Sequence, residues 1–305
     1  MAAEFIPIPI SEAGRIAQYA IIPPGPNGLD IEIAQVEHRL EIINSWGIEP
    51  GSRVLEVGCG QGTCTTILAE FVGPNGHVDA FDNASLDYGA PYTIGQSQGH
   101  ISKGPLGSRI TWHNEDLTEY LKDKTDLSKW SWDYIVFCHS LWYFESRAQA
   151  ARLLEELRNR AREVLVAEYA LAATEPRALP HVYASIARGM LEACKPASEE
   201  NIRSLFAPLE IKALIEEHRW AFVKRTIITP GEALLDGEWE TGTVKSWEFL
   251  DEIEAVVEDP RQQLVLRSAR EAVLGAIERI GKQRVRTMDV WATSYRLVGY
   301  DDVRT

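Results

Sequence analysis

Cysteine is scarce in this sequence of 305 residues. Its four cysteines, Cys59, Cys64, Cys138 and Cys194, form no CxxC pair and no spacing typical of a zinc site. Proteins that depend on disulfides carry denser and paired cysteines. We therefore expect a reduced, intracellular and cytoplasmic protein with free thiols.

Basic residues are also few compared with acidic ones. The chain has 31 Lys and Arg against 45 Asp and Glu, which gives a formal charge of -14. Binding to nucleic acid or to an anionic membrane surface needs a positively charged face. The composition therefore argues against nucleic acid and membranes as partners and favours a small-molecule substrate. It leaves open whether the protein is a monomer or a homodimer.

Long hydrophobic runs are missing as well. No apolar stretch approaches the length of about 18 residues that a membrane span needs. The N-terminus lacks the basic residues and the uninterrupted apolar run of a signal peptide, since two prolines interrupt residues 5–10. We expect residues 1–28 to form an extended arm that lies over the domain or over a partner and serves as a lid.

The sequence does contain a cluster of glycines directly after a short apolar run. Residues 54–57, Val-Leu-Glu-Val, are typical of a buried strand, and Gly58, Gly60 and Gly62 follow within five residues. A helical pattern begins at Thr63. A strand that turns on glycines into a helix presents free N–H groups and lets a ligand lie directly on the backbone. We therefore expect a ligand site here.

Strand and helix patterns alternate around this loop, as in the βαβ units of a parallel sheet. A helix is expected over 30–46, and a short irregular helix with a loop over 83–108. Beyond 172 the alternation breaks, and a loop is expected over 230–242. The remaining expected strands are 77–82, 109–113, 132–138, 163–169, 221–229 and 288–297, and the remaining helices are 117–124, 146–161, 180–194, 207–218 and 245–282, the last broken near 259–260.

The glycine spacing excludes two other nucleotide-binding loops. The dinucleotide fingerprint is G-x-G-x-x-G, and its third glycine position is occupied here by Thr63. A phosphate-binding P-loop needs Gly-Lys-Ser or Gly-Lys-Thr, which does not follow these glycines.

The segment Glu56-Val57-Gly58-Cys59-Gly60-Gln61-Gly62 resembles the signature of the class I S-adenosylmethionine-dependent methyltransferases of the small-molecule type. That signature is an acid, any residue and Gly-x-Gly-x-Gly after the first strand. Asp82, Asp116 and the segment 132–144 agree with later family positions in order and spacing. The resemblance covers about 30–170 clearly, and 221–229 and 288–297 more weakly.

The resemblance implies an α/β fold, with a Rossmann-like, seven-stranded, mostly parallel sheet and helices on both faces. It also implies one methyltransferase domain over residues 29–305. The parts that depart from the alternating pattern, about 172–219 and 230–287, are expected to form a helical cap together with the N-terminal arm.

S-adenosyl-L-methionine is the cofactor that the resemblance implies, with S-adenosyl-L-homocysteine as the product. Asp82 would accept from the ribose hydroxyls and Asp116 from the adenine amino group. Two alternatives stay open, a helix N-cap role for Asp116 and an adenine contact from Glu115. The expected cofactor-binding residues are Glu56, Gly58, Cys59, Gly60, Asp82, Asn83, Glu115, Asp116, Leu117, Cys138 and His139.

The metal-dependent branch of this family has an aspartate at the end of the fourth strand, where Cys138 and His139 stand here. We therefore predict a metal-independent, in-line displacement, in which alignment supplies most of the catalysis. A general base is needed only if the acceptor must lose a proton. His139 and His181 are the catalytic candidates, ahead of Glu168 and Tyr19, although a purely structural role for either histidine stays open.

The expected acceptor is small and partly aromatic or apolar, because aromatic side chains follow the strands and lie in the arm and the cap. The candidate substrate-binding residues are Tyr19, Tyr92, Trp142, Tyr143, Tyr169, His181, Tyr183 and Trp239. We predict methyl transfer to oxygen or nitrogen of this acceptor. The alternatives are a cofactor-binding protein with lyase, pericyclase or regulatory activity, and a protein methyltransferase with an open groove in place of a closed lid.

Overall fold

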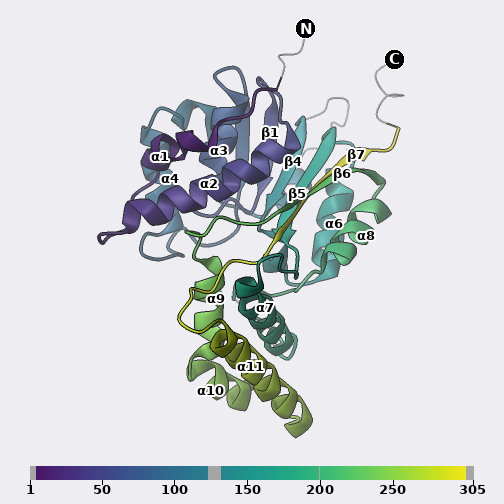
Figure 1. Cartoon of the computed structure of the whole chain (residues 1–305). Coiled ribbons are helices and arrows are strands. Elements are labelled where there is room, and N and C mark those ends of the chain that lie inside the picture. Colours follow the sequence, from purple (N-terminus) through teal and green to yellow (C-terminus); the bar gives the residue numbers. More distant parts are fainter. Residues whose placement is uncertain (1–4, 123–131, 199, 300–305) are drawn as a thin grey trace.

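The computed structural model describes residues 5–122, 132–198 and 200–299. At its centre is a seven-stranded sheet with the order β3-β2-β1-β4-β5-β7-β6 (Figure 1). Its strands are β1 (Arg53–Val57), β2 (His77–Phe81), β3 (Ile110–His113), β4 (Tyr134–Cys138), β5 (Glu163–Tyr169), β6 (Trp220–Ile228) and β7 (Val290–Leu297). The first five strands pair in parallel, and β7 runs antiparallel to both of its neighbours. The predicted Rossmann-like fold is confirmed.

The strand order reverses between β1 and β4, which are hydrogen-bonded neighbours. The chain leaves β1 toward β2 on one side and leaves β4 toward β5 on the other. Such a switch point opens a crevice at the carboxyl ends of the two strands, where open α/β sheets bind their ligands. The glycine loop after β1 and residues 139–144 after β4 both lie at this crevice.

Helices cover both faces of the sheet because each buried strand is apolar on both sides. Val54 packs into the core under one set of helices and Leu55 into the core under the other, and both are fully buried. The first set is α1 (Ala13–Ile16), α2 (Gly28–Trp46), α3 (Thr63–Val72) and α4 (Ile94–Lys103), and the second is α5 (Leu117–Lys122), α6 (Arg147–Leu157) and α8 (Pro208–Glu217). Short 3-10 turns complete these layers, at Ile10–Glu12, Ala17–Tyr19, Gly107–Arg109, Leu141–Tyr143 and Pro176–Ala178.

A helical cap projects from the carboxyl end of the sheet (Figure 1). It consists of α7 (Leu179–Glu192), α9 (Asp236–Lys245), α10 (Glu248–Val256) and α11 (Pro260–Ile280). The cap has a hydrophobic core of its own, which includes Leu191, Phe249, Ile253 and Val273. Its helices come from two segments of the chain, one that follows β5 and one that follows β6. Of the segment 172–219, only α7 belongs to this group, because α8 packs beside α6 and β6.

Two expectations about local structure are wrong. Residues 230–242 were expected to form a loop, yet α9 begins at Asp236. Gly237, which disfavours a helix by propensity, is required there because a Cβ atom would lie 2.3 Å from the carbonyl oxygen of Arg286. The arm is also not extended throughout, since residues 10–19 form helical turns that bury Ala13 and Ile16 against the domain.

The other elements start and end within a few residues of their predicted bounds. The irregular helix expected in 83–108 is α4, which begins with a capping box between Thr93 and Gln96. The predicted helix 117–124 corresponds to α5 up to Lys122, and its last two positions lie outside the described residues. None of the described helices has the length and apolar content needed to cross a membrane.

Candidate functional site

The glycine loop after β1 is shaped by close packing at its two ends and is open in the middle. A Cβ atom on Gly58 would lie 2.6 Å from Cβ of Ser140, and one on Gly62 would lie 2.7 Å from the ring of Trp112. Both glycines have positive φ, +80° and +98°. At Gly60 a Cβ atom would meet no atom within 4 Å. The outer glycines therefore fit the loop to the protein, and the middle one leaves space for a ligand.

Two predicted acids hold this loop in place. Asp82, at the end of β2, accepts hydrogen bonds from the backbone N–H of Gly60 at 2.7 Å and of Ala84 at 2.9 Å. Each oxygen keeps a second acceptor position, and the half-buried carboxylate can still bind a ribose diol. Glu56 is buried below the loop, where Oγ1 of Thr65 donates to it at 2.5 Å. Burial raises the pKa of Glu56 to about 7.

Asp116 is the N-cap of α5, which was one of the alternatives left open by the sequence. Its Oδ1 accepts from the backbone N–H of Glu119 at 3.1 Å, whereas its Oδ2 makes no hydrogen bond within the described part of the chain. Leu117 is buried beside it, and Glu115 is exposed with Oε1 at 3.8 Å from Nδ1 of His113. One oxygen of Asp116 therefore remains available for an adenine amino group.

The remaining predicted cofactor positions differ in exposure. Cys59 and Cys138 are buried, and Asn83 is exposed. The open face at Gly60, the carboxylate of Asp82 beside it and the free oxygen of Asp116 follow one another along the carboxyl ends of β1, β2 and β3. Their donors and acceptors fit the amino-acid end, the ribose and the adenine of S-adenosylmethionine.

A cluster of buried polar side chains lies next to the loop, at the ends of β4 and β5. His139 has φ +54°, which is uncommon for a residue with a side chain, and its backbone N–H donates to the carbonyl of Ala167. Its Nδ1 lies 3.5 Å from Oε1 of Glu168. Its Nε2 lies 3.0 Å from Nε2 of His38, which α2 contributes. Three elements thus build one His38–His139–Glu168 line.

The two histidines of this line differ in their affinity for a proton. Burial alone would lower the pKa of His139, but the contact with Glu168 outweighs it and leaves this pKa above its ordinary value. Burial and the neighbouring His139 hold the pKa of His38 well below its ordinary value. A proton on the pair therefore resides on His139, where Glu168 stabilises it.

Tyr169 joins the predicted acceptor residues to the cap. Its ring centroid lies 4.5 Å from that of His139, 5.4 Å from that of Trp142 and 5.0 Å from that of His181. Its hydroxyl donates to Oδ2 of Asp236 in α9 at 2.7 Å. Burial raises the pKa of Tyr169 well above its ordinary value, so the hydroxyl keeps its proton. These four predicted residues do come together.

His181 is fully buried and differs from His139 in its bonding. The backbone N–H of Met288 donates to its Nδ1 at 3.1 Å, so the proton of the neutral ring resides on Nε2. Burial lowers the pKa of His181 to about 4. The nitrogen of His181 that could accept a proton is therefore already occupied.

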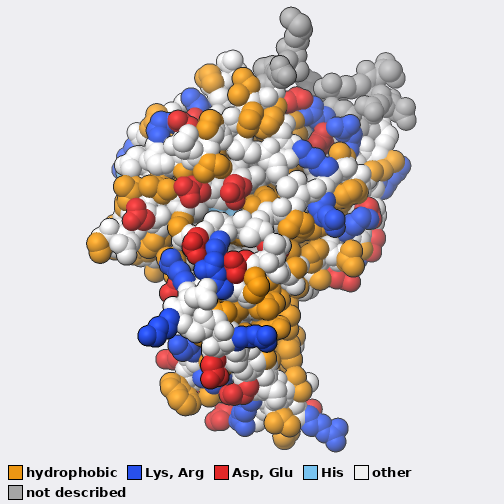
Figure 2. Space-filling model, in the orientation of Figure 1, with side chains coloured by type: hydrophobic (Ala, Val, Ile, Leu, Met, Phe, Trp, Pro, Cys, Tyr) orange, Lys and Arg blue, Asp and Glu red, His pale blue; other side chains and the backbone are white. Residues whose placement is uncertain are grey.

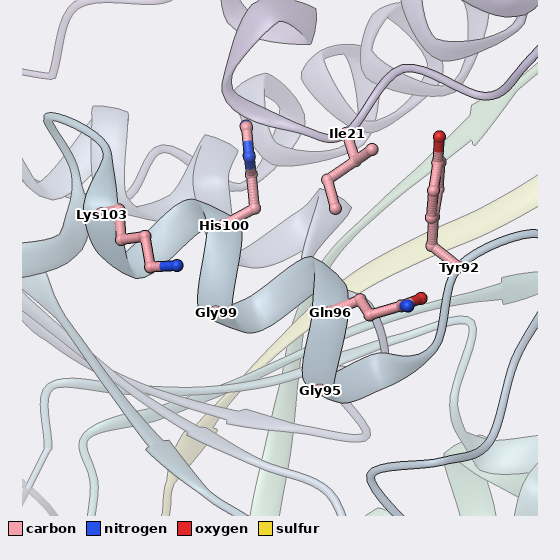
Figure 3. Close-up of a pocket in the computed structure, with 7 residues that line it drawn as sticks. All are labelled: Ile21, Tyr92, Gly95, Gln96, Gly99, His100 and Lys103. Carbon is pink, nitrogen blue, oxygen red and sulfur yellow. The ribbon is translucent and has the colours of Figure 1, made fainter.

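Except for Tyr143, whose hydroxyl lies within electrostatic reach of Glu168 and Asp236, the other candidate acceptor residues do not join this cluster. The hydroxyl of Tyr19 donates to Glu70 at 2.6 Å, beyond the middle of α3. Tyr92 lines a recess of about 410 Å³, where it and Ile21 lie over the face of α4 that carries Gln96 and His100 (Figure 3). The remaining three side chains are each about half exposed: Tyr143, Tyr183 and Trp239.

Sequence reasoning missed His38 and Asp236, for identifiable reasons. The apolar residues of 30–46 recur at helical spacing and predict one buried face, but α2 also buries Glu32, Ala34 and His38, because it contacts β6 and β7 as well as α3. Asp236 lay in a segment that was expected to be a loop. The only signal for either was a polar residue beside an apolar stripe, which is common on surface helices.

Comparison with protein families gives a match over the cofactor end of the chain. The family described as protein-L-isoaspartate(D-aspartate) O-methyltransferase (PCMT) matches residues 26–86. This segment runs from the start of α2 through the glycine loop and β2, and it ends before α4. The match therefore concerns the binding of the methyl donor and contains none of the cap.

Similar proteins extend the comparison to most of the chain. Methyltransferase phomM' of Diaporthe leptostromiformis is 25% identical over 276 residues, which cover 78% of this chain and 71% of the relative. The crystal structure of a cyclopropane-fatty-acyl-phospholipid synthase-like protein from Lactobacillus casei is 30% identical, with a TM-score of 0.82 over 94% of this chain and 99% of that one. A putative sarcosine dimethylglycine methyltransferase from Galdieria sulphuraria shares the fold, with 11% identity and a TM-score of 0.50 over 93% of this chain and 98% of that one.

Proposed function

Because this chain belongs to the class I S-adenosylmethionine-dependent methyltransferases, we propose that it methylates a small molecule held between the sheet and the cap. The cofactor supplies an electrophilic methyl group for an in-line displacement. The observation that carries the proposal is the cluster of Trp142, His139, Tyr169 and His181 beside the glycine loop. It offers aromatic surfaces for an acceptor and one histidine that can hold a proton.

The cap supports a small acceptor over a protein. Asp236 of α9 accepts from Tyr169 at 2.7 Å and from Nε2 of Gln35 in α2 at 2.9 Å. The cap is thereby joined to β5 and to α2, one on each side of the cluster. A protein segment would need an open groove at this place, whereas a lid held at two points suits a ligand that it can enclose.

The His38–His139–Glu168 line supports transfer to a hydroxyl or ammonium group, because such an acceptor must lose a proton to be methylated. The His38–His139 pair would accept this proton and hold it on His139, where Glu168, 3.5 Å from Nδ1, would stabilise the imidazolium. His38 lies 3.0 Å from Nε2 of His139, so a proton received by one ring can pass to the other. Such a base typically contributes a factor of about 10²–10⁴ to the rate.

The test is a turnover assay with methyl-labelled cofactor and a panel of small phenols, amines and carboxylic acids, with peptides and an unfolded protein alongside. We expect release of S-adenosylhomocysteine together with a labelled small product. His139→Gln should lower kcat about 100-fold or more. His100→Gln is the matched control, because His100 is exposed on α4 at the separate recess, and it should leave turnover unchanged.

Two results would contradict the proposal. One is labelling confined to the peptides or the protein, which would assign a macromolecular acceptor. The other is consumption of the cofactor or conversion of a substrate without any labelled product, which would assign non-methylating chemistry to the site.

A further inference from the structure

Arg39 is a cation at the edge of the site with no carboxylate partner. Its Nη1 donates to the carbonyl of Gln35 at 3.3 Å and to Oε1 of Gln35 at 2.5 Å, one turn earlier on α2. Within the described ranges 5–122, 132–198 and 200–299, no carboxylate oxygen lies within ion-pair distance of its guanidinium. Its side chain retains some accessible surface, so Nε and Nη2 are not sealed.

Gln35 keeps the nearest cap acid away from this cation. Its side-chain amide donates to Oδ1 of Asp236 at 2.9 Å, while its oxygen accepts from Arg39. Oδ2 of Asp236 is taken by the hydroxyl of Tyr169. Glu32, on the same helix, is buried with Oε1 unpartnered and does not reach Arg39 either. Two acids are thus near, and neither neutralises the guanidinium by contact.

A buried arginine of the cap has the carboxylate partners that Arg39 lacks. Arg188, which is buried in the cap, lies 2.6 Å from Glu252 and 3.3 Å from Glu192. Burial by itself lowers the pKa of Arg39, but its neighbours Cys138, Asp236, Cys64 and Tyr169 outweigh this, so Arg39 stays charged. An interior charge without a partner destabilises a fold unless a ligand supplies the opposite charge.

The neighbours of Arg39 also locate it. Cys138 ends β4 and Cys64 lies in the first turn of α3, directly after the glycine loop. Tyr169 and Asp236 belong to the acceptor cluster. The guanidinium therefore stands where the cofactor side of the site meets the acceptor side, close to the positive end of α3.

We propose that Arg39 binds a carboxylate group of a ligand in this site, carried either by the acceptor or by the amino-acid end of the cofactor. The proposal rests on the proposed function for the location of the acceptor. A guanidinium with two free N–H directions can hold a carboxylate through paired hydrogen bonds, which a lysine cannot reproduce. Gln35 orients the fork from the opposite side.

Calorimetry separates the two sources of the carboxylate without turnover. The full-length wild type, Arg39→Gln and Arg39→Lys are titrated with S-adenosylhomocysteine and with its decarboxylated analogue. The protein saturated with S-adenosylhomocysteine is then titrated with benzoate. Arg267→Gln, an exposed cap arginine that pairs with Glu254 at 3.1 Å, is the matched control, and thermal melting verifies that each variant is folded.

If the cofactor carries the carboxylate, Arg39→Gln should weaken S-adenosylhomocysteine about 10- to 100-fold and leave the decarboxylated analogue unchanged. If the acceptor carries it, the affinity for S-adenosylhomocysteine should stay and benzoate binding should fall by a similar factor. In both cases Arg39→Lys should recover only part of the affinity. Equal weakening of both cofactor analogues, or binding of all three probes that does not differ from that of wild type, would overturn the proposal.

Discussion

The glycine loop allows a prediction that separates packing from ligand contact. In Gly58→Ala the new methyl group meets Cβ of Ser140 at 2.6 Å, at a φ of +80°. The left-handed backbone costs about 1–2 kcal/mol, and overpacking of a rigid site adds about 1–3 kcal/mol. In Gly60→Ala φ is +51° and the methyl group meets nothing within 4 Å. Only the backbone cost then applies, yet the methyl group enters the space assigned to the ligand.

The assay is a thermal melt of each variant with and without S-adenosylhomocysteine. At about 2 °C per kcal/mol for a chain of this size, Gly58→Ala should lower Tm by roughly 4–10 °C and Gly60→Ala by no more than about 4 °C. Ligand stabilisation should persist in Gly58→Ala once it is folded. It should be largely lost in Gly60→Ala.

A compensating change tests the origin of the larger effect. Adding Ser140→Gly to Gly58→Ala removes the atom that the methyl group meets, and about half of the lost stability should return. If S-adenosylhomocysteine stabilises Gly60→Ala as strongly as wild type, the space at Gly60 is not part of the ligand site. If Gly58→Ala melts no lower than Gly60→Ala, the contact with Ser140 does not add to the cost of the substitution.

Three further predictions follow from single contacts. Glu168 raises the pKa of His139, so this pair stabilises the fold fully below the ordinary histidine pKa of about 6.5, and its contribution is lost as pH rises through the pKa of the folded state. Urea unfolding from pH 5 to 8 should therefore show a pH-dependent difference in stability between wild type and His139→Gln. An equal difference at every pH would contradict this prediction. Tyr169→Phe removes the hydroxyl that donates to Asp236, and it should lower the free energy of unfolding by about 1.5–3 kcal/mol. It should also speed proteolysis within the cap. Unchanged cleavage would show that this hydrogen bond does not hold the cap. Asp82→Asn keeps the shape but loses the charge on the ribose side, and should weaken S-adenosylhomocysteine about 10-fold or more in calorimetry; an affinity equal to that of wild type would remove Asp82 from the cofactor site.

The sheet and the cofactor end could be predicted from the sequence for a physical reason. Strands β1, β4 and β5 are buried on both faces, so each is rich in apolar residues, and β4 is a continuous apolar run. The loop after β1 needs glycine where Ser140 and Trp112 approach it, and this leaves a spacing in the sequence. Asp82 follows its strand directly, because a parallel sheet places such residues at one edge.

The acceptor side was harder to predict from the sequence, because its residues meet only through tertiary packing. His38 and Arg39 lie on α2, which contacts β6 and β7, about 180 and 250 residues later in the chain. Asp236 lies in a helix whose glycine is explained by its packing against the carbonyl of Arg286. Local periodicity in the sequence does not reveal such contacts. The sequence therefore pointed to aromatic residues such as Tyr19 as acceptor-binding residues.

Most of the cap packs around a hydrophobic core of its own, although Val182 of α7 also packs into the core of the sheet. Its helices can therefore be exchanged as a unit while β1, β2 and the glycine loop stay unchanged. Such an arrangement lets the acceptor side change during evolution while the strands and the loop at the cofactor end are kept. A chimaera that carries the cap of a relative, joined after β5 and β6 and before β7, is the natural way to transfer acceptor choice between members of the family.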